Sequence, residues 1–138
     1  MIRKNPSGHL PVIAESAYVD KTAILCGKVI VQDNVFIGPY AVIRADEVDA
    51  SGDMQPIVIG ANSNIQDGVV IHSKSGAAVT IGSHTSIAHR SIIHGPCQVG
   101  TGCSSASTAC CSTAPWAMAV WCGTTRWWTA ATCHRAST

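Results

Sequence analysis

The sequence predicts an all-β fold, a parallel β-helix in which three hexapeptide repeats make one coil. Aliphatic anchor residues recur at steps of six, and small residues often stand four places after them. Glycine frequently follows the anchor, as in Ile37-Gly38, Ile59-Gly60 and Ile81-Gly82. This spacing fits neither the helical period of about 3.6 residues nor simple alternation along a strand. It is typical of one short strand and one turn per repeat, with each anchor facing a narrow core.

The repeats come in three runs, separated by two breaks. The first run has its anchors at Ile13, Val19, Leu25, Val31, Ile37 and Ile43. The segment EVDASGDMQP (Glu47–Pro56) breaks the period, and the second run follows at Ile59, Ile65 and Ile71. The segment SKSGAA (Ser73–Ala78) breaks it again, and the third run has Ile81, Ile87, Ile93 and Val99. We expect the runs to form stacked coils and the breaks to form loops directed outward.

Composition divides the chain into two parts. All acidic residues lie at or before Asp67, whereas all four tryptophans lie after residue 103. We therefore predict a β-helix domain over residues 1–103 and an aberrant tail over residues 104–138 that continues no repeat. A shifted reading frame near codon 103 explains the tail, because restoring one base to plausible GC-rich codons returns repeat-like sequence. We expect this tail to be irregular or poorly ordered.

Charge and hydropathy exclude some classes of function. The net charge is +1, and no basic face stands out, so we expect no nucleic-acid partner. The chain has no apolar run of about 18 residues, so we expect no membrane partner. It also has no charged and apolar leader, from which we expect a cytoplasmic protein.

The coil count places three polar side chains in one column. Arg44, His72 and His94 occupy the same outward position on three successive coils, separated by about 4.8 Å each. Two imidazoles at this spacing can bind one metal ion, since Zn–N bonds are about 2.0–2.1 Å long. Asp67 and His89 fall on a different face, so His89 would reach such an ion only from a neighbouring subunit. Three imidazoles and an open position form the ligand set of a catalytic zinc ion.

Three motifs carry a resemblance to a known family. IRADE (Ile43–Glu47), NIQDGVVIH (Asn64–His72) and SIAHRSIIHGP (Ser86–Pro96) resemble the γ-class carbonic anhydrases, over about residues 2–103. The resemblance implies a left-handed parallel β-helix, a homotrimer and a lyase that reversibly hydrates CO2 to bicarbonate. In that family, metal-bound hydroxide at a trimer interface attacks CO2. The implied metal ligands are His72, His89 and His94, and the implied cofactor is Zn²⁺, with Fe²⁺ or Co²⁺ as alternatives.

The resemblance also implies roles for the polar residues around these ligands. Gln66 resembles the glutamine that hydrogen-bonds the metal-bound water, and Glu47 resembles a glutamate that takes part in proton transfer. Arg44 resembles the arginine near the bicarbonate site, which also pairs with interface carboxylates. Asp46 and Asp67 match those carboxylates. A purely structural role in interface ion pairs is the alternative for these three residues.

Two further functions remain open at this point. The chain departs from the best-studied family members in its loop after His72, because SKSGAA is short and contains no carboxylate. A non-catalytic β-helix assembly protein that keeps the metal for cohesion is therefore one alternative. A hexapeptide-repeat acyltransferase is the other, although its usual pattern lacks these motifs.

Overall fold

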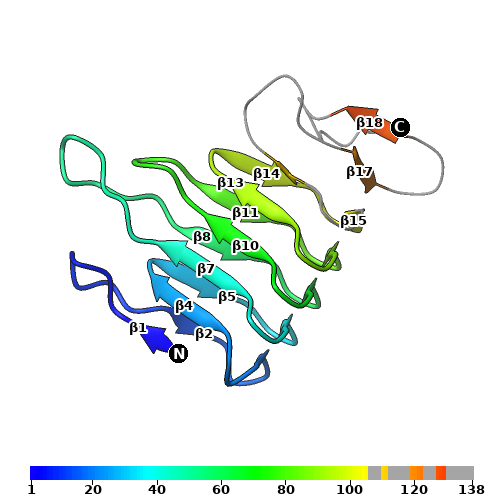
Figure 1. The fold of residues 1–138 in the computed structure, drawn as a ribbon, viewed down its shortest axis with the longest axis horizontal. Coiled ribbons are helices and arrows are strands. Elements are labelled where there is room, and N and C mark those ends of the chain that lie inside the picture. The colour runs from blue at the N-terminus through cyan, green and yellow to red at the C-terminus, as the bar shows by residue number, and fades with distance from the viewer. Residues whose placement is uncertain (106–109, 112–118, 123–126, 130–138) are drawn as a thin grey trace.

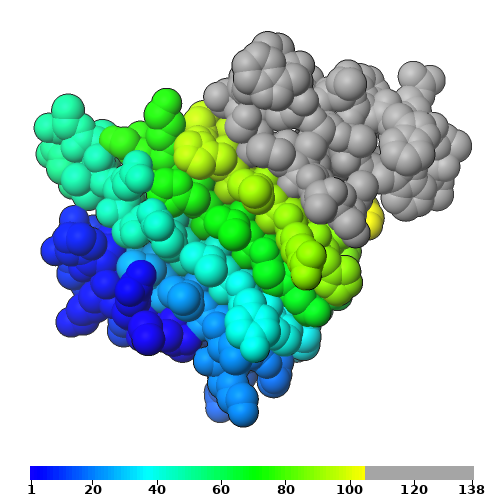
Figure 2. All heavy atoms as spheres, in the orientation of Figure 1, coloured from blue at the N-terminus to red at the C-terminus, as the bar shows by residue number. Residues whose placement is uncertain are grey.

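The chain folds as a parallel β-helix, as predicted. The computed structural model describes residues 1–105, 110–111, 119–122 and 127–129. Short strands follow one another around three sides, and successive coils stack on one another from the N-terminal end onward (Figure 1). On the surface the coils form bands that follow the order of the chain (Figure 2). The described residues contain no helix of the length and apolarity that crossing a membrane requires.

The first sheet, here called the histidine sheet, carries Arg44, His72 and His94. Its strands lie in the order β1 (Ile2–Arg3), β4 (Ile24–Gly27), β7 (Val42–Ala45), β10 (Val70–His72), β13 (Ile92–His94) and β16 (Cys110–Cys111). All of these pairings are parallel. The sheet therefore places equivalent residues of successive coils in direct register.

The second sheet contains the strands that come after the two breaks in the repeat. Its strands lie in the order β14 (Cys97–Val99), β11 (Val79–Ile81), β8 (Ile57–Ile59), β5 (Val29–Val31) and β2 (Val12–Ile13). These pairings are also parallel. The two breaks in the repeat, residues 47–56 and 73–78, lie between the histidine sheet and this sheet, as predicted.

The third sheet completes each coil. Its parallel strands are β3 (Tyr18–Val19), β6 (Phe36–Ile37), β9 (Asn64–Ile65), β12 (Ser86–Ile87) and β15 (Cys103–Ser105). The exposed rings of Tyr18 and Phe36 stack on its outer face, with centroids 5.2 Å apart. The chain passes from this sheet to the histidine sheet through turns at residues 38–41, 66–69 and 88–91. These three stacked turns are here called the His89 corner.

The anchors fill the core, which confirms the predicted repeat. The anchors from Leu25 onward are at most 3% exposed: Leu25, Val31, Ile37, Ile43, Ile59, Ile65, Ile71, Ile81, Ile87, Ile93 and Val99. Burial of each such side chain contributes about 1.5–3 kcal/mol. Ile13 and Val19 lie at the N-terminal end and are only partly buried.

The glycines after the anchors permit close stacking of the coils. A Cβ atom at Gly60 would lie 2.5 Å from the backbone nitrogen of Ser83. A Cβ atom at Gly82 would lie 2.5 Å from the backbone nitrogen of Thr101. The anchor-glycine pattern therefore reflects close approach of the next coil, which only glycine allows at these two positions.

The described part of the tail adds strands to two sheets. β15 and β16 continue the parallel pairing with β12 and β13. β17 (Ala119–Cys122) then pairs antiparallel with β15, and β18 (Trp127–Thr129) pairs antiparallel with β17. The pairing thus departs from the parallel repeat after β16. The rest of residues 104–138 lies outside the described residues, so the division at residue 103 and the irregular tail stay predictions.

Candidate metal centre

The predicted column of polar residues is formed. His72 pairs in register with Arg44 on one neighbouring strand and with His94 on the other. The preceding residue of each strand, Ile43, Ile71 or Ile93, is buried. Because successive side chains of a strand point to opposite faces, Arg44, His72 and His94 point outward.

The His72 and His94 rings lie close enough to act on one ligand. Their centroids are 5.2 Å apart, and the ring planes meet at 63°. Two imidazole nitrogens are suitable ligands for zinc, which also accepts oxygen donors and water. The donor chemistry of this pair therefore fits a divalent transition metal.

The Nε2 atom of His72 is surrounded by charged groups. Glu47 Oε1 lies 3.2 Å away, Asp46 Oδ1 lies 3.6 Å away, and Arg44 Nη2 lies 3.3 Å away. A single Nε2 atom either donates its proton to a carboxylate or offers its lone pair to a cation. The two carboxylates and the guanidinium therefore compete for one atom.

Arg44 is held by a carboxylate of its own chain. Its Nε atom lies 3.2 Å from Asp46 Oδ2, and its Nη2 atom donates to Asp46 Oδ1 at 3.3 Å. The Arg44 side chain is 40% exposed, whereas that of Asp46 is only 19% exposed. Asp46 thus fixes the guanidinium beside His72 and leaves part of it open to solvent. Of the two carboxylates that the resemblance assigns to Arg44, Asp46 pairs with it within this chain.

The loop that carries Glu47 is internally braced. Asp49 Oδ1 accepts hydrogen bonds from the Ser51 hydroxyl at 2.6 Å, from the Ser51 amide at 2.8 Å and from the Asp53 amide at 2.9 Å. The Ser51 hydroxyl bond, followed by the Asp53 amide bond, holds the pKa of Asp49 below its ordinary value. Ser75 Oγ also donates to the carbonyl oxygen of Val48 at 2.7 Å. The two loops therefore support each other beside His72.

His89 lies apart from the other two histidines. It follows β12 at the His89 corner, and its Nδ1 atom lies 3.7 Å from Asp67 Oδ2 of the preceding coil. Both side chains are 56% exposed. Within the described ranges, no group of three histidine, cysteine, aspartate or glutamate residues is arranged to hold a metal ion. One chain thus holds a pair of histidines on the histidine sheet and a separate histidine at the corner of the coil.

Gln66 and Asn64 lie on the third sheet and its corner. Gln66 is half-buried, and its backbone N–H donates to the carbonyl oxygen of Ile87 at 3.0 Å. Asn64 pairs in register with Phe36 and Ser86, and its buried Oδ1 atom has no hydrogen-bond partner among the described residues. The sequence reasoning did not single out Asn64. Its position one residue before the buried anchor Ile65 predicts only that its side chain points away from the core.

The chain is similar over part of its length to proteins of known name. No family model matches it. The carbonic anhydrase of Methanosarcina thermophila is 38% identical over 115 residues, covering 70% of this chain and 44% of that protein. The carnitine operon protein CaiE of Escherichia coli O157:H7 is 37% identical over 93 residues, covering 67% of this chain and 43% of that protein. The chain thus spans less than half the length of these two relatives.

Solved structures show the same architecture. A hexapeptide transferase family protein from Anaplasma phagocytophilum superposes with a TM-score of 0.58 and 26% sequence identity. The match covers 68% of this chain and 50% of that one. The fold is accordingly a left-handed parallel β-helix.

Proposed function

Because the chain belongs to the carbonic-anhydrase-like hexapeptide-repeat family, we propose that it is a metal-dependent hydratase that interconverts CO2 and bicarbonate. The observation that carries the proposal is the geometry around His72. Two histidines lie in register on adjacent strands, and a guanidinium and two carboxylates surround the outward nitrogen of one of them. This is the combination of metal ligand, anion-binding group and proton acceptor that the reaction needs.

We place the metal between subunits. His72 and His94 would bind it from one chain, and His89 would bind it from the neighbouring chain of a homotrimer. The exposed position of His89, away from the other two ligands of its own chain, supports this arrangement. Zinc is the proposed ion, with iron(II) or cobalt(II) as alternatives. Bound there, the ion would activate water as the nucleophile for CO2.

Arg44 is proposed to favour the anionic product. Its guanidinium lies 3.3 Å from His72 Nε2 and is held by Asp46. A fixed cation beside the reaction centre stabilises negative charge that develops on the oxygens of CO2. Gln66 is proposed to orient the attacking water by a hydrogen bond, a role that follows from its place in the NIQD motif.

Glu47 is proposed to carry the proton away. Its carboxylate lies 3.2 Å from His72 Nε2 and is 47% exposed, so it faces both the site and the solvent. A carboxylate in that position can accept a proton and release it to buffer. The loop Ser73–Ala78 contains no carboxylate, which leaves Glu47 and Asp46 as the acidic groups beside His72.

The test combines three measurements on the full chain. Metal content, oligomer mass and the rate of CO2 hydration by stopped flow are measured on one purified sample. The proposal expects one metal ion per chain, a trimer and hydration that disappears when the metal is removed. A trimer that binds no zinc, iron or cobalt would exclude the proposed metal centre. A metal-loaded trimer without hydration would instead favour a non-catalytic assembly protein.

The likeness to a hexapeptide transferase favours a second candidate, an acyltransferase. Such an enzyme would bind an acyl-CoA donor between subunits. Calorimetric titration with acetyl-CoA separates the two candidates. Saturable binding of acetyl-CoA together with absence of bound metal would favour the transferase.

A further inference from the structure

The geometry points to Asp67 as a positioning residue for His89. It would hold the Nδ1 proton of His89, so that Nε2 presents its lone pair to a metal ion on the neighbouring subunit. This inference rests on the proposed metal centre, because it assigns a partner to one of its ligands. It differs from the interface ion pair with Arg44 that the family resemblance implies for Asp67.

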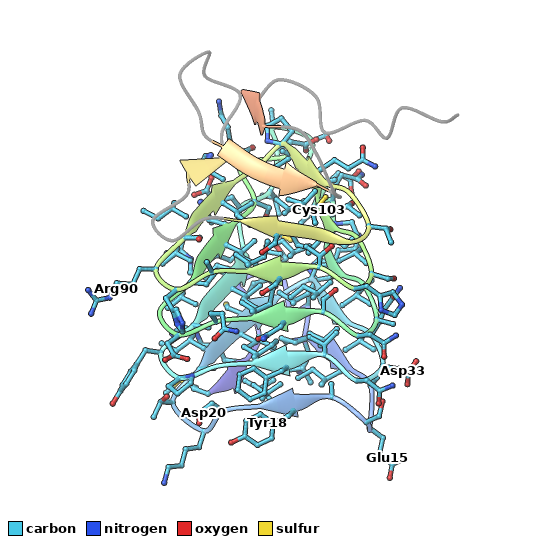
Figure 3. All side chains as sticks on the ribbon, turned by 90° about the vertical axis from the view of Figure 1, so that its right-hand side faces the viewer. Glu15, Tyr18, Asp20, Asp33, Arg90 and Cys103 are labelled. Atoms are coloured by element: carbon cyan, nitrogen blue, oxygen red, sulfur yellow. The ribbon has the colours of Figure 1, made fainter. Side chains whose placement is uncertain are left out.

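The backbone brings the two side chains together. Asp67 and His89 occupy equivalent places in successive coils, and the amide of Arg90 donates to the carbonyl oxygen of Asp67 at 2.9 Å. The backbone N–H of Gln66, one residue before Asp67, donates to the carbonyl oxygen of Ile87 and so links the same two coils. Arg90 itself extends away from the coils (Figure 3). The Asp67 carboxylate lies 3.7 Å from His89 Nδ1. The pair is therefore set by coil register.

Gly38 makes room for the Asp67 carboxylate. A Cβ atom at Gly38 would lie 2.8 Å from Asp67 Oδ1 and 3.1 Å from the Asp67 amide nitrogen. A side chain at position 38 would therefore displace the carboxylate from its present place. One oxygen, Oδ1, lies over Gly38, and the other, Oδ2, faces His89 Nδ1 at 3.7 Å.

The chemistry of histidine gives this contact a consequence. A neutral imidazole carries its proton on one nitrogen and a lone pair on the other. A carboxylate beside Nδ1 favours the proton there, and the lone pair at Nε2 then becomes the ligand. The separation of 3.7 Å is longer than a hydrogen bond, so in the free chain the contact is electrostatic.

The first test reads the tautomer of His89 in the metal-free protein. Nitrogen-15 NMR at a pH where the imidazole is neutral reports which ring nitrogen carries the proton. We expect the Nδ1–H form in the parent chain and loss of that preference in Asp67→Ala. Asp67→Asn keeps an oxygen acceptor and should therefore retain part of the preference for the Nδ1–H form. The control is Asp33→Ala, which removes an exposed carboxylate at the end of the third sheet away from Arg90 (Figure 3).

The second test reads metal affinity by competition with a chromophoric chelator, using zinc alone. Loss of a carboxylate behind a metal-binding histidine weakens binding about 10- to 100-fold. Asp67→Ala should show this loss, and Asp33→Ala should not. An unchanged His89 tautomer, or an unchanged zinc affinity, in Asp67→Ala overturns the inference. Failure of the metal centre itself is seen separately, as unchanged zinc content in His89→Ala.

Discussion

His72 and His94 lie directly opposite each other on the adjacent parallel strands β10 and β13, with their ring centroids 5.2 Å apart. Arg44 occupies the same position one strand further along the sheet. Since backbone pairing fixes this register, the two histidines are held together without help from a loop. The proposed third ligand, His89, is 56% exposed at the corner of the coil. It is therefore the ligand that depends on how subunits assemble.

Removal of either paired histidine should abolish stable metal binding. His72→Ala or His94→Ala leaves two imidazole ligands for the proposed ion, and zinc sites that persist normally have at least three protein ligands. Metal analysis after dialysis checks the zinc content per chain. His84→Ala is the matched control, because His84 is an exposed histidine at another corner. Full zinc content in His72→Ala would contradict the assignment.

The column of Arg44, His72 and His94 could be predicted from the sequence because it depends only on the repeat. Once the anchors Ile43, Ile71 and Ile93 are assigned to the core, the next residue of each must point outward. Coil counting likewise placed Asp67 and His89 together. The contacts of Glu47 with His72 could not be predicted in this way, because the segment Glu47–Pro56 follows no repeat. Its shape depends on local hydrogen bonds such as those of Asp49.

Arg44→Ala should lower kcat/KM for CO2 hydration by about 10- to 100-fold, as expected for loss of one charged stabilising group. Zinc content should stay the same, because Arg44 is not a ligand. Arg44→Lys should rescue little, since an ammonium group cannot make the forked contact with Asp46. Stopped-flow hydration measures the rate. A parent-like kcat/KM in Arg44→Ala would assign Arg44 to a structural ion pair only.

Glu47→Gln should slow proton release without loss of metal. We expect kcat to fall about 100-fold in weak buffer and to recover as a small imidazole buffer is added, because the buffer replaces the missing base. Asp53→Asn is the control, since this acidic residue lies in the same loop and its side chain is exposed. Stopped-flow rates at several buffer concentrations provide the measurement. A kcat that does not respond to buffer in Glu47→Gln would exclude the proton-transfer role.

The loop that carries Glu47 should loosen in acid. The pKa of Asp49 is lowered, chiefly by the Ser51 hydroxyl, so its stabilising bonds are fully present above the ordinary value of 3.8. They are lost as the pH falls through the lower pKa of the folded state. NMR titration of the Asp49 carboxyl carbon should show this pKa, and Ser51→Ala should raise it toward the ordinary value. Ser7→Ala, at an exposed site elsewhere, should leave it in place.

Gly60→Ala should destabilise the coil stack. The added Cβ would lie within 2.5 Å of the Ser83 amide nitrogen, and this backbone cannot move without breaking the coil. Overpacking of this kind costs about 1–3 kcal/mol or more. Gly52→Ala has open space around its Cβ and should cost about 1 kcal/mol, through its left-handed backbone alone. Urea unfolding of both variants checks the order, and equal stabilities would refute close coil packing at Gly60.

Complementation between two inactive variants tests the shared metal centre most directly. His89→Ala and His94→Ala chains are unfolded, mixed in equal amounts and refolded, and zinc content is measured on the purified trimer. If each site takes His72 and His94 from one chain and His89 from the next, random mixing restores about one quarter of the sites in a cyclic trimer. The account predicts that recovery, with no tightly bound zinc in either variant refolded alone. A mixed trimer without zinc would contradict the shared site, because about one quarter of its sites would then contain all three intact histidines and should bind the ion.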